Sequence, residues 1–143
     1  MTINQLSIFV ENKAGTVAEI TKSIAKAGVS IRALSVADTQ EFGILRLIVD
    51  DVEKAKAALH ENECVVSITK VIGVEIPDVA GGLSTVLELM SENNINVEYL
   101  YAFITISGKH AYVVLRVEDN EKAATILTES GIKLVTQQDI DAL

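Results

Sequence analysis

Hydrophobic residues follow two periods along this chain, and the periods come in an order that occurs twice. Apolar and polar side chains alternate over residues 5–10, as in a strand with one buried face. Over residues 16–27 the apolar positions recur every three or four residues, which is the stripe of an amphipathic helix, and Gly28 supplies its stop. The first half reads as strand, helix, strand, strand, helix and strand over residues 5–10, 16–27, 30–37, 44–49, 50–62 and 64–68.

The second half repeats this order. A shift of 66 residues places Ala14-Gly15 on Ala80-Gly81, and a shift of 68 beyond the hairpin aligns a run of identical residues. That run aligns Val49, Asp51, Glu53, Lys54, Ala55, Leu59 and Glu61 with Val117, Asp119, Glu121, Lys122, Ala123, Leu127 and Glu129. The second set of elements is expected at residues 71–76, 82–93, 97–106, 111–118, 121–130 and 133–136.

The predicted fold class is α+β, with two tandem ferredoxin-like βαββαβ units at residues 1–69 and 70–143. Each unit should place its helices on one face of an antiparallel sheet. No flexible linker separates the copies at residues 67–73, so we expect the sheets to join into one eight-stranded sheet that hides two edges. Asp50 stands at capping-box spacing from Glu53 and, with Asp51, suits the start of the second helix.

Composition narrows the function classes. The net charge is −8, which disfavours nucleic acid and anionic membranes as partners. Cys64 stands alone, so neither a disulfide nor a cysteine metal pair is expected. No apolar run is long enough to cross a bilayer, and residues 1–5 lack the character of a signal peptide, so the expected compartment is the cytoplasm. The sequence predicts no cofactor.

The two turns from the first strand to the first helix carry the candidate chemistry. Residues 10–15 and 76–81 each bring a short polar side chain, a small residue and a glycine to a helix start. Unpaired amides and the positive end of the helix dipole favour an anion there, such as a carboxylate. In the alternative interpretation, Asn12 and Asp78 only shape the turns, while Thr16 caps its helix with Glu19 three residues on.

These turns, the helices and the strands after them resemble the ACT domain, a regulatory module attached to many enzymes of amino-acid metabolism. The resemblance is carried by Asn12-Lys13-Ala14-Gly15, Gly28-Val29-Ser30-Ile31, Pro77-Asp78-Val79-Ala80-Gly81 and Asn94-Ile95-Asn96-Val97. It covers the chain as two tandem copies. The first half is also similar to the opening of acetolactate synthase regulatory subunits, which the second half fits less well.

The resemblance implies that an amino acid binds between paired units. The turn of one unit then faces the start of the second strand of its neighbour. One site would join Asn12 and Gly15 to Asn96, and the other Asp78 and Gly81 to Ser30, which departs from the family's asparagine. Asparagine can serve both ligand groups, so the Asn12/Asn96 site is expected to be the tighter. The full candidate set is Asn12, Lys13, Ala14, Gly15, Asn96, Asp78, Ala80, Gly81 and Ser30.

Other reactive or aromatic residues do not form a catalytic pattern. His60 and His110 lack a nucleophile or carboxylate arrangement that recurs in the other copy, so both are assigned to the surface. Tyr99, Tyr101 and Phe103 alternate along one strand, but they lack the basic residues of an RNA-binding sheet. Core, dimer interface and ligand wall all remain open for these aromatics.

The sequence therefore predicts a non-enzymatic sensor of a free amino acid. Alternatives are a regulatory subunit of an amino-acid biosynthetic enzyme, similar to that of acetolactate synthase, and a structural partner protein without a ligand. An enzyme of the acylphosphatase kind would need an arginine in the first turn, and neither turn has one. Apolar side chains on both faces of residues 99–104 further predict a homodimer.

Overall fold

The computed structural model describes residues 1–38, 41–104 and 109–143, which divide into two compact units. We call them the first-repeat unit, Asn4–Thr69 with Ile140–Leu143, and the second-repeat unit, Met1–Ile3 with Lys70–Asp139. The three N-terminal residues therefore belong to the unit of the second repeat, and the four C-terminal residues to that of the first. No helix in the described ranges is long and apolar enough to cross a membrane.

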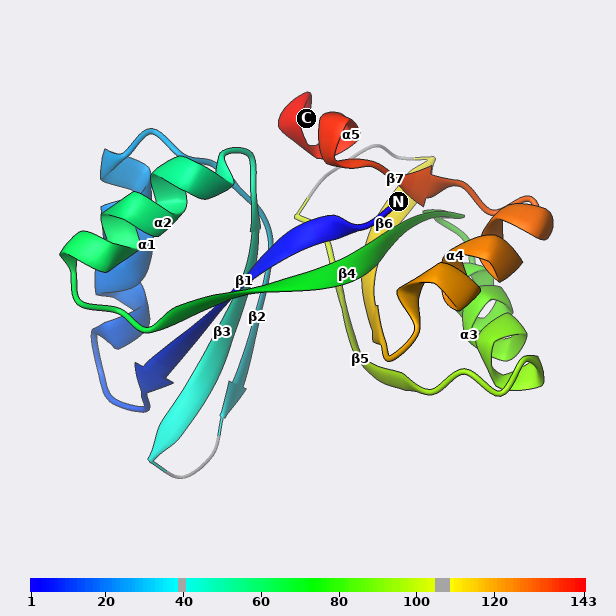
Figure 1. Ribbon diagram of the computed structural model, residues 1–143, viewed down its shortest axis with the longest axis horizontal. Helices are drawn as coiled ribbons and strands as arrows, with labels where there is room; N and C mark the ends of the chain where they lie inside the picture. Colours follow the sequence, from blue (N-terminus) through cyan, green and yellow to red (C-terminus); the bar gives the residue numbers. More distant parts are fainter. Residues whose placement is uncertain (39–40, 105–108) are drawn as a thin grey trace. The chain divides into compact units, whose positions relative to one another are not determined.

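The first-repeat unit has the predicted order of elements. Its strands form an antiparallel arrangement in the order β2-β3-β1-β4, and α1 and α2 lie together on one face of it (Figure 1). The register pairs Leu6 with Leu47, and Leu47 with Leu34. The elements are β1 (Ile3–Glu11), α1 (Thr16–Lys26), β2 (Ile31–Asp38), β3 (Phe42–Val49), α2 (Val52–Glu61) and the first part of β4 (Val66–Pro77).

The second-repeat unit repeats this arrangement with strand order β5-β6-β4-β7. The predicted α+β class and the ferredoxin-like topology of each copy are confirmed. After β4 its elements are α3 (Gly82–Glu92), β5 (Val97–Ala102), β6 (His110–Val117), α4 (Asn120–Glu129), β7 (Leu134–Val135) and α5 (Gln137–Asp141). The middles of both predicted hairpin turns, residues 39–40 and 105–108, lie outside the described residues.

The expectation of eight strands is wrong. The described residues form seven, because the last strand of the first repeat and the first strand of the second are one continuous strand, β4. Its middle, Ile68-Thr69-Lys70-Val71, contains three β-branched residues and no glycine, proline, asparagine, aspartate or serine, so nothing in it ends a strand. The copies therefore share one strand across the boundary between Thr69 and Lys70.

Each unit has its own hydrophobic core, and the two cores use equivalent residues. Leu59 and Leu127 are both fully buried, on α2 and α4. Ala55 and Ala123 lie one helical turn earlier on the same helices and are also fully buried. The run of identical residues that revealed the repeat is therefore a repeated helix face together with its cap.

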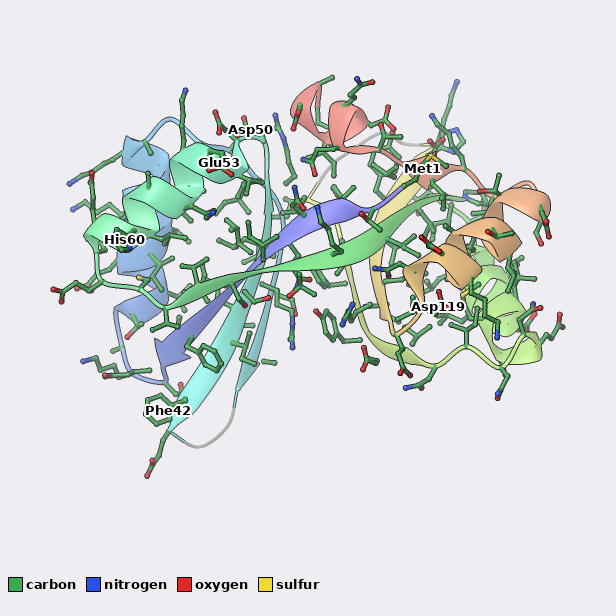
Figure 2. The ribbon with its side chains drawn as sticks, in the orientation of Figure 1. Met1, Phe42, Asp50, Glu53, His60 and Asp119 are labelled. Carbon is green, nitrogen blue, oxygen red and sulfur yellow. The ribbon has the colours of Figure 1, made fainter. Side chains whose placement is uncertain are left out.

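The start of α2 differs from the prediction. Asp51, rather than Asp50, is the N-cap, and its carboxylate accepts a hydrogen bond from the amide of Lys54 at 3.1 Å. Asp119 does the same for Lys122 at 3.0 Å on α4. Asp50 instead turns toward the start of β2, as described below; Figure 2 labels it near the start of α2, beyond the end of β3 opposite to Phe42.

The C-terminal helix α5 was not predicted, because five residues are too few to display a helical period. It is held by a reciprocal cap. The carboxylate of Asp139 accepts from the amide and hydroxyl of Thr136 at 2.8 and 2.9 Å, and the hydroxyl accepts from the Asp139 amide at 3.2 Å. These hydrogen bonds lower the pKa of Asp139 below its usual value.

Candidate ligand-binding turns and strand starts

The two strand-to-helix turns have almost the same backbone. Gly15 precedes α1 with φ 88° and ψ −16°, and Gly81 precedes α3 with φ 86° and ψ −6°. Positive φ favours glycine, since a side chain there would crowd the backbone. Neither helix start has a side-chain cap. The amides of Thr16 and Gly82 donate within their own turns, to Lys13 O at 3.4 Å and Val79 O at 3.1 Å, so the helix amides offered to a ligand lie after these residues.

Backbone hydrogen bonds fix the polar residue of each turn. The amide of Asn12 donates to Glu41 O at 2.9 Å, and the amide of Asp78 donates to Lys109 O at 3.0 Å. Each of these partners lies beside the hairpin of its own repeat. Asn12 and Asp78 are therefore positioned alike, although one side chain is an amide and the other a carboxylate.

The alternative in which Thr16 caps α1 is wrong, because Gly15 is the N-cap. The hydroxyl oxygen of Thr16 is buried and has no hydrogen-bond partner among the described residues. In the second repeat the equivalent residue is Gly82, where a Cβ would collide with the backbone oxygen of Pro77. The first turn therefore has space that the second lacks.

The start of β2 carries charge that the sequence analysis missed. The amide of Ser30 donates to the Asp50 carboxylate at 2.9 Å, and Arg32 Nη2 lies 3.6 Å from the same carboxylate. Arg32 sits where the register of β2 on β3 shifts, so it is the extra residue of a β-bulge. Its Nε is buried without a partner in the part of the chain that the structure describes.

The start of β5 has the opposite charge. A bulge again occurs, and its extra residue is Glu98, which pairs with Arg116 Nε at 3.3 Å. Asn96 lines two neighbouring hollows of about 370 and 390 Å³. The first of these is lined by Asn94, Ile95, Asn96, Glu98, Glu118, Asp119 and Lys122. Glu98 is paired with Arg116 and the Asp119 carboxylate caps α4, so the lining keeps an acidic excess over Lys122 that favours a cationic group.

Within one repeat the turn and the strand start are not brought together. Asn12, Lys13, Ala14 and Gly15 precede α1, whereas Ser30 follows it, and an 11-residue helix spans about 16 Å. The same separation holds for Asp78, Ala80 and Gly81 before α3, and Asn96 after it. A site that uses both needs two units, and the pairing of Asn12 with Asn96 and of Asp78 with Ser30 stays a prediction.

Arg32 and Glu98 could have been found from the sequence. The shift of 66 that aligns Ser30 with Asn96 also aligns Arg32 with Glu98, and the later shift aligns Asp50 with Glu118. A reversal of charge beside a candidate ligand residue is a visible signal. In the described ranges, no three histidine, cysteine or acidic side chains gather as metal ligands would.

The comparisons with known proteins agree with this architecture. The family described as "ACT domain pair" matches residues 1–143. A crystal structure of a protein from Bacteroides thetaiotaomicron is 38% identical, with a TM-score of 0.92, over 100% of this chain and 98% of that one. The regulatory subunit of aspartate kinase from Thermus thermophilus is 14% identical, with a TM-score of 0.63, over 88% of this chain and 90% of that one.

The corresponding subunit from Thermus flavus shares 14% identity, with a TM-score of 0.62, over 90% of this chain and 92% of that one. At this identity these two subunits share the fold alone. No curated protein matches the chain. The match over both repeats, together with the duplicated glycine turns and strand order, shows that the chain belongs to the ACT domain pair family.

Proposed function

We propose that this protein is a regulatory sensor. It binds a free amino acid between ACT units and does not convert it into a product. The observation that carries the proposal is the hollow beside Asn96, which combines amide groups with the carboxylates of Glu98, Glu118 and Asp119. An amino acid brings an ammonium for this acidic hollow and a carboxylate for the amides at a glycine turn.

The Asn12 turn is the better partner for that hollow. Lys13 gives it a positive charge, which attracts the ligand's carboxylate, although Glu11 pairs with this lysine at 3.0 Å. Asp78 in the second turn would repel a carboxylate placed close to it. We therefore assign the tighter site to Asn12, Lys13, Ala14, Gly15 and Asn96.

The second combination, Asp78, Ala80 and Gly81 with Ser30, is proposed as the weaker site. The Ser30 amide already donates to Asp50, so a ligand would have to compete with a bonded carboxylate. Arg32 beside it suits an anion rather than an ammonium. Stoichiometry near one ligand per chain follows from this inequality.

The partner proposals rest on the fold and on exposed apolar side chains. A fold shared with an aspartate kinase regulatory subunit makes an amino-acid biosynthetic enzyme a reasonable class of partner. For the proposed homodimer, Tyr101 and Phe103 are only 8% exposed, so these two aromatics are buried within the chain itself, while Tyr99 is half-buried. The row of Leu100 and Ile104, 38% and 61% exposed, is the surface that remains for a second copy.

A thermal-shift screen of the full chain against the twenty amino acids tests the proposal. At 100 times Kd, a bound ligand should stabilise the fold by about 2.7 kcal/mol. Calorimetry on Asn96→Ala should then show at least tenfold weaker binding, while the matched Ser30→Ala variant binds as the wild type does. Binding lost in Ser30→Ala but kept in Asn96→Ala would reverse the assignment. If no amino acid shifts the thermal transition, the alternative of a structural partner protein without a ligand is favoured.

A further inference from the structure

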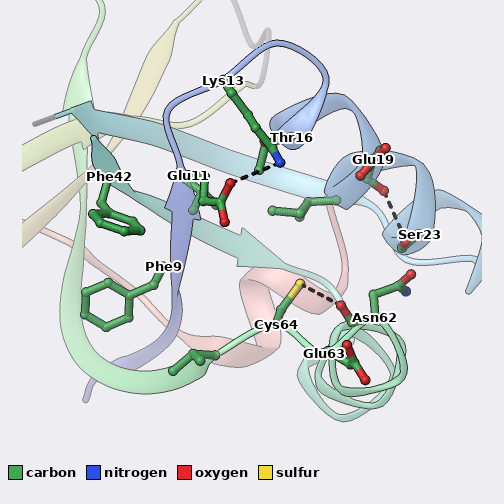
Figure 3. Close-up of a pocket in the computed structure, with 13 residues that line it drawn as sticks. Phe9, Glu11, Lys13, Thr16, Glu19, Ser23, Phe42, Asn62, Glu63 and Cys64 are labelled. Atoms are coloured by element: carbon green, nitrogen blue, oxygen red, sulfur yellow. Dashed lines mark hydrogen bonds and ion pairs between the residues drawn. The ribbon is translucent and has the colours of Figure 1, made fainter. Parts of the chain in front are cut away.

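A hollow of about 440 Å³ lies inside the first repeat, and neither Asn96 nor Ser30 lines it. It is enclosed by the end of β1, the first turns of α1 and the loop from α2 to β4 (Figure 3). We call it the Phe9 pocket. Its lining residues are Phe9, Val10, Glu11, Lys13, Thr16, Glu19, Ile20, Ser23, Phe42, Asn62, Glu63, Cys64 and Val65. The volume falls in the range of small-molecule sites.

One wall of the Phe9 pocket is apolar and exposed. Phe9, Phe42 and Val65 are 59%, 54% and 66% exposed, and Figure 3 shows the two phenyl rings near each other at one side of the hollow. The amide of Phe9 donates to Val65 O at 3.2 Å, which fixes these two residues side by side. Three large apolar side chains are thus held together in water at one end of a sheet.

The second repeat has charged residues at the same three positions. Glu75 corresponds to Phe9, since its amide donates to Lys133 O at 2.9 Å as the amide of Phe9 does to Val65 O. His110 corresponds to Phe42, since it pairs with Pro77 as Phe42 pairs with Glu11. Glu75 lies 3.3 Å from His110 Nδ1 and 3.0 Å from Lys133 Nζ. The fold therefore accepts an ion-paired cluster here, and folding alone does not require the apolar set.

At two positions around the pocket, the first repeat carries a polar side chain where the second repeat has glycine. Thr16 replaces Gly82, so the first repeat has an opened helix start with an unpartnered, buried hydroxyl oxygen among the described residues. Glu63, with φ 59°, replaces Gly131, with φ 79°. A side chain at such a φ costs about 1 kcal/mol relative to glycine. The first repeat thus bears strain to place a carboxylate at the rim of the pocket.

The charges of the pocket select a cation. Glu11, Glu19 and Glu63 face a single lysine, Lys13, which is ion-paired with Glu11. The carboxylates of Glu19 and Glu63 are thus the groups for a ligand's ammonium. Phenyl faces also attract an ammonium, at about 0.5–1 kcal/mol for an exposed ring.

We propose that the Phe9 pocket binds a small organic ammonium compound with an aromatic or branched apolar body. The apolar body lies against Phe9, Phe42 and Val65, and the ammonium faces the carboxylates of Glu19 and Glu63. This site goes beyond the amino-acid site proposed above, because it is complete within one repeat. The two sites share Lys13 as a lining residue, but the Phe9 pocket does not use Asn12 or Asn96. An α-amino acid and a simple amine both carry the required chemistry.

Cys64 lines the pocket and is the only cysteine of the chain, so its alkylation reports occupancy. Burial raises the pKa of this thiol above the ordinary value for cysteine, so the alkylation rate of the full chain is best measured in alkaline buffer, where more of the thiolate is present. We expect 2-phenylethylamine at ten times its Kd to slow alkylation about tenfold. The matched acid, 3-phenylpropionate, should give no protection. Equal protection by phenylalanine identifies an amino acid as the ligand, and protection by the amine alone identifies a simple amine.

A variant with three substitutions copied from the second repeat tests whether the apolar wall is needed for binding. Phe9→Glu, Phe42→His and Val65→Lys together install the cluster that the second repeat already carries, so the chain should fold, as circular dichroism will check. Binding of the amine should weaken at least tenfold. Glu63→Gly, which copies Gly131 of the second repeat, should weaken binding without loss of stability, and it keeps the test open if the triple variant misfolds.

Asn96→Ala serves as the control, because it removes the separately proposed site and should leave protection of Cys64 unchanged. Undiminished protection in the triple variant or in Glu63→Gly would overturn the proposal. So would protection by 3-phenylpropionate in place of the amine.

Discussion

The first strand of each repeat ends in the same glycine turn, but the side chains around the two turns differ in kind. Gly15 and Gly81 have φ angles of 88° and 86°, and Asp51 and Asp119 cap equivalent helices. Around this shared frame the first repeat exposes phenylalanine where the second has an ion-paired glutamate. The glycine turns and the helix caps are what the fold requires of each copy. The surface positions around them are free to acquire separate functions.

The two strand starts teach the same lesson through charge. Both contain a β-bulge, and its extra residue is Arg32 in one copy and Glu98 in the other. A bulge redirects one side chain without breaking the sheet, so a change of residue there changes the local field and little else. Two sites built from these halves should differ in affinity even though their backbones match.

Truncation of the equivalent core leucines should give the largest effect. Leu59→Ala and Leu127→Ala each remove a fully buried side chain, and each should lower the free energy of unfolding by about 2–5 kcal/mol. Because β4 serves both repeats, we expect both variants to lower the midpoint of one shared transition in urea. A separate early transition in Leu127→Ala alone would show that the units unfold independently.

Exchange of the residues at the helix starts should sharpen the contrast between the turns. Gly82→Thr forces a Cβ against the backbone oxygen of Pro77 and should destabilise the protein by about 1–3 kcal/mol. The reverse change, Thr16→Gly, should cost less than about 1 kcal/mol, since the first turn already has space. Equal losses in urea unfolding would contradict the difference in room between the two turns.

Removal of the helix caps should have matched, smaller effects. Asp51→Ala and Asp119→Ala each delete one carboxylate that accepts from a helix amide, and each should cost about 1 kcal/mol. Asp50→Ala is the control for α2, because Asp50 does not cap that helix. A larger loss of α2 stability from Asp50→Ala than from Asp51→Ala, measured by hydrogen exchange, would restore Asp50 as the cap, as its spacing from Glu53 predicts.

The smallest effect concerns Lys133. Its hydrogen bond and charge interaction with Glu75 raise its pKa above the ordinary value for lysine, so the folded state favours the protonated lysine. A raised folded pKa gives stability that is fully present below the unfolded pKa and is lost as the pH rises through the folded pKa. In Glu75→Gln, NMR titration of the Lys133 side chain should show a lower pKa. An unchanged pKa would mean that Glu75 does not hold this lysine.

Much of the architecture was readable from the sequence because periodicity and duplication reinforced each other. Leu59 and Leu127 are identical at the expected shift, and both prove to be core residues. The failures have physical causes. The two strands expected around Thr69 are merged because no residue there breaks a strand, and α5 is too short to show a period.

The candidate sites were less accessible to sequence reasoning. The glycine turns were visible because their residues are contiguous, and the structure gives them the expected helix-start geometry. The Phe9 pocket was not visible, since Phe9, Phe42 and Val65 come from separate elements and meet only through strand register and loop packing. Whether a turn meets a strand start in another unit also depends on pairing between units, which no local pattern encodes.

Because β4 is continuous, the number of residues at the junction of the repeats decides which face of the strand each later side chain occupies. Val66 packs against the first core, while Ile72, Val74 and Ile76 belong to the second, so the same alternate positions serve both. One residue inserted between Thr69 and Lys70 would move every later side chain of the strand to the opposite face. Two inserted residues would restore the faces. In such a protein, an odd number of residues inserted at the junction of the repeats would need a β-bulge, like those at Arg32 and Glu98, to keep the faces.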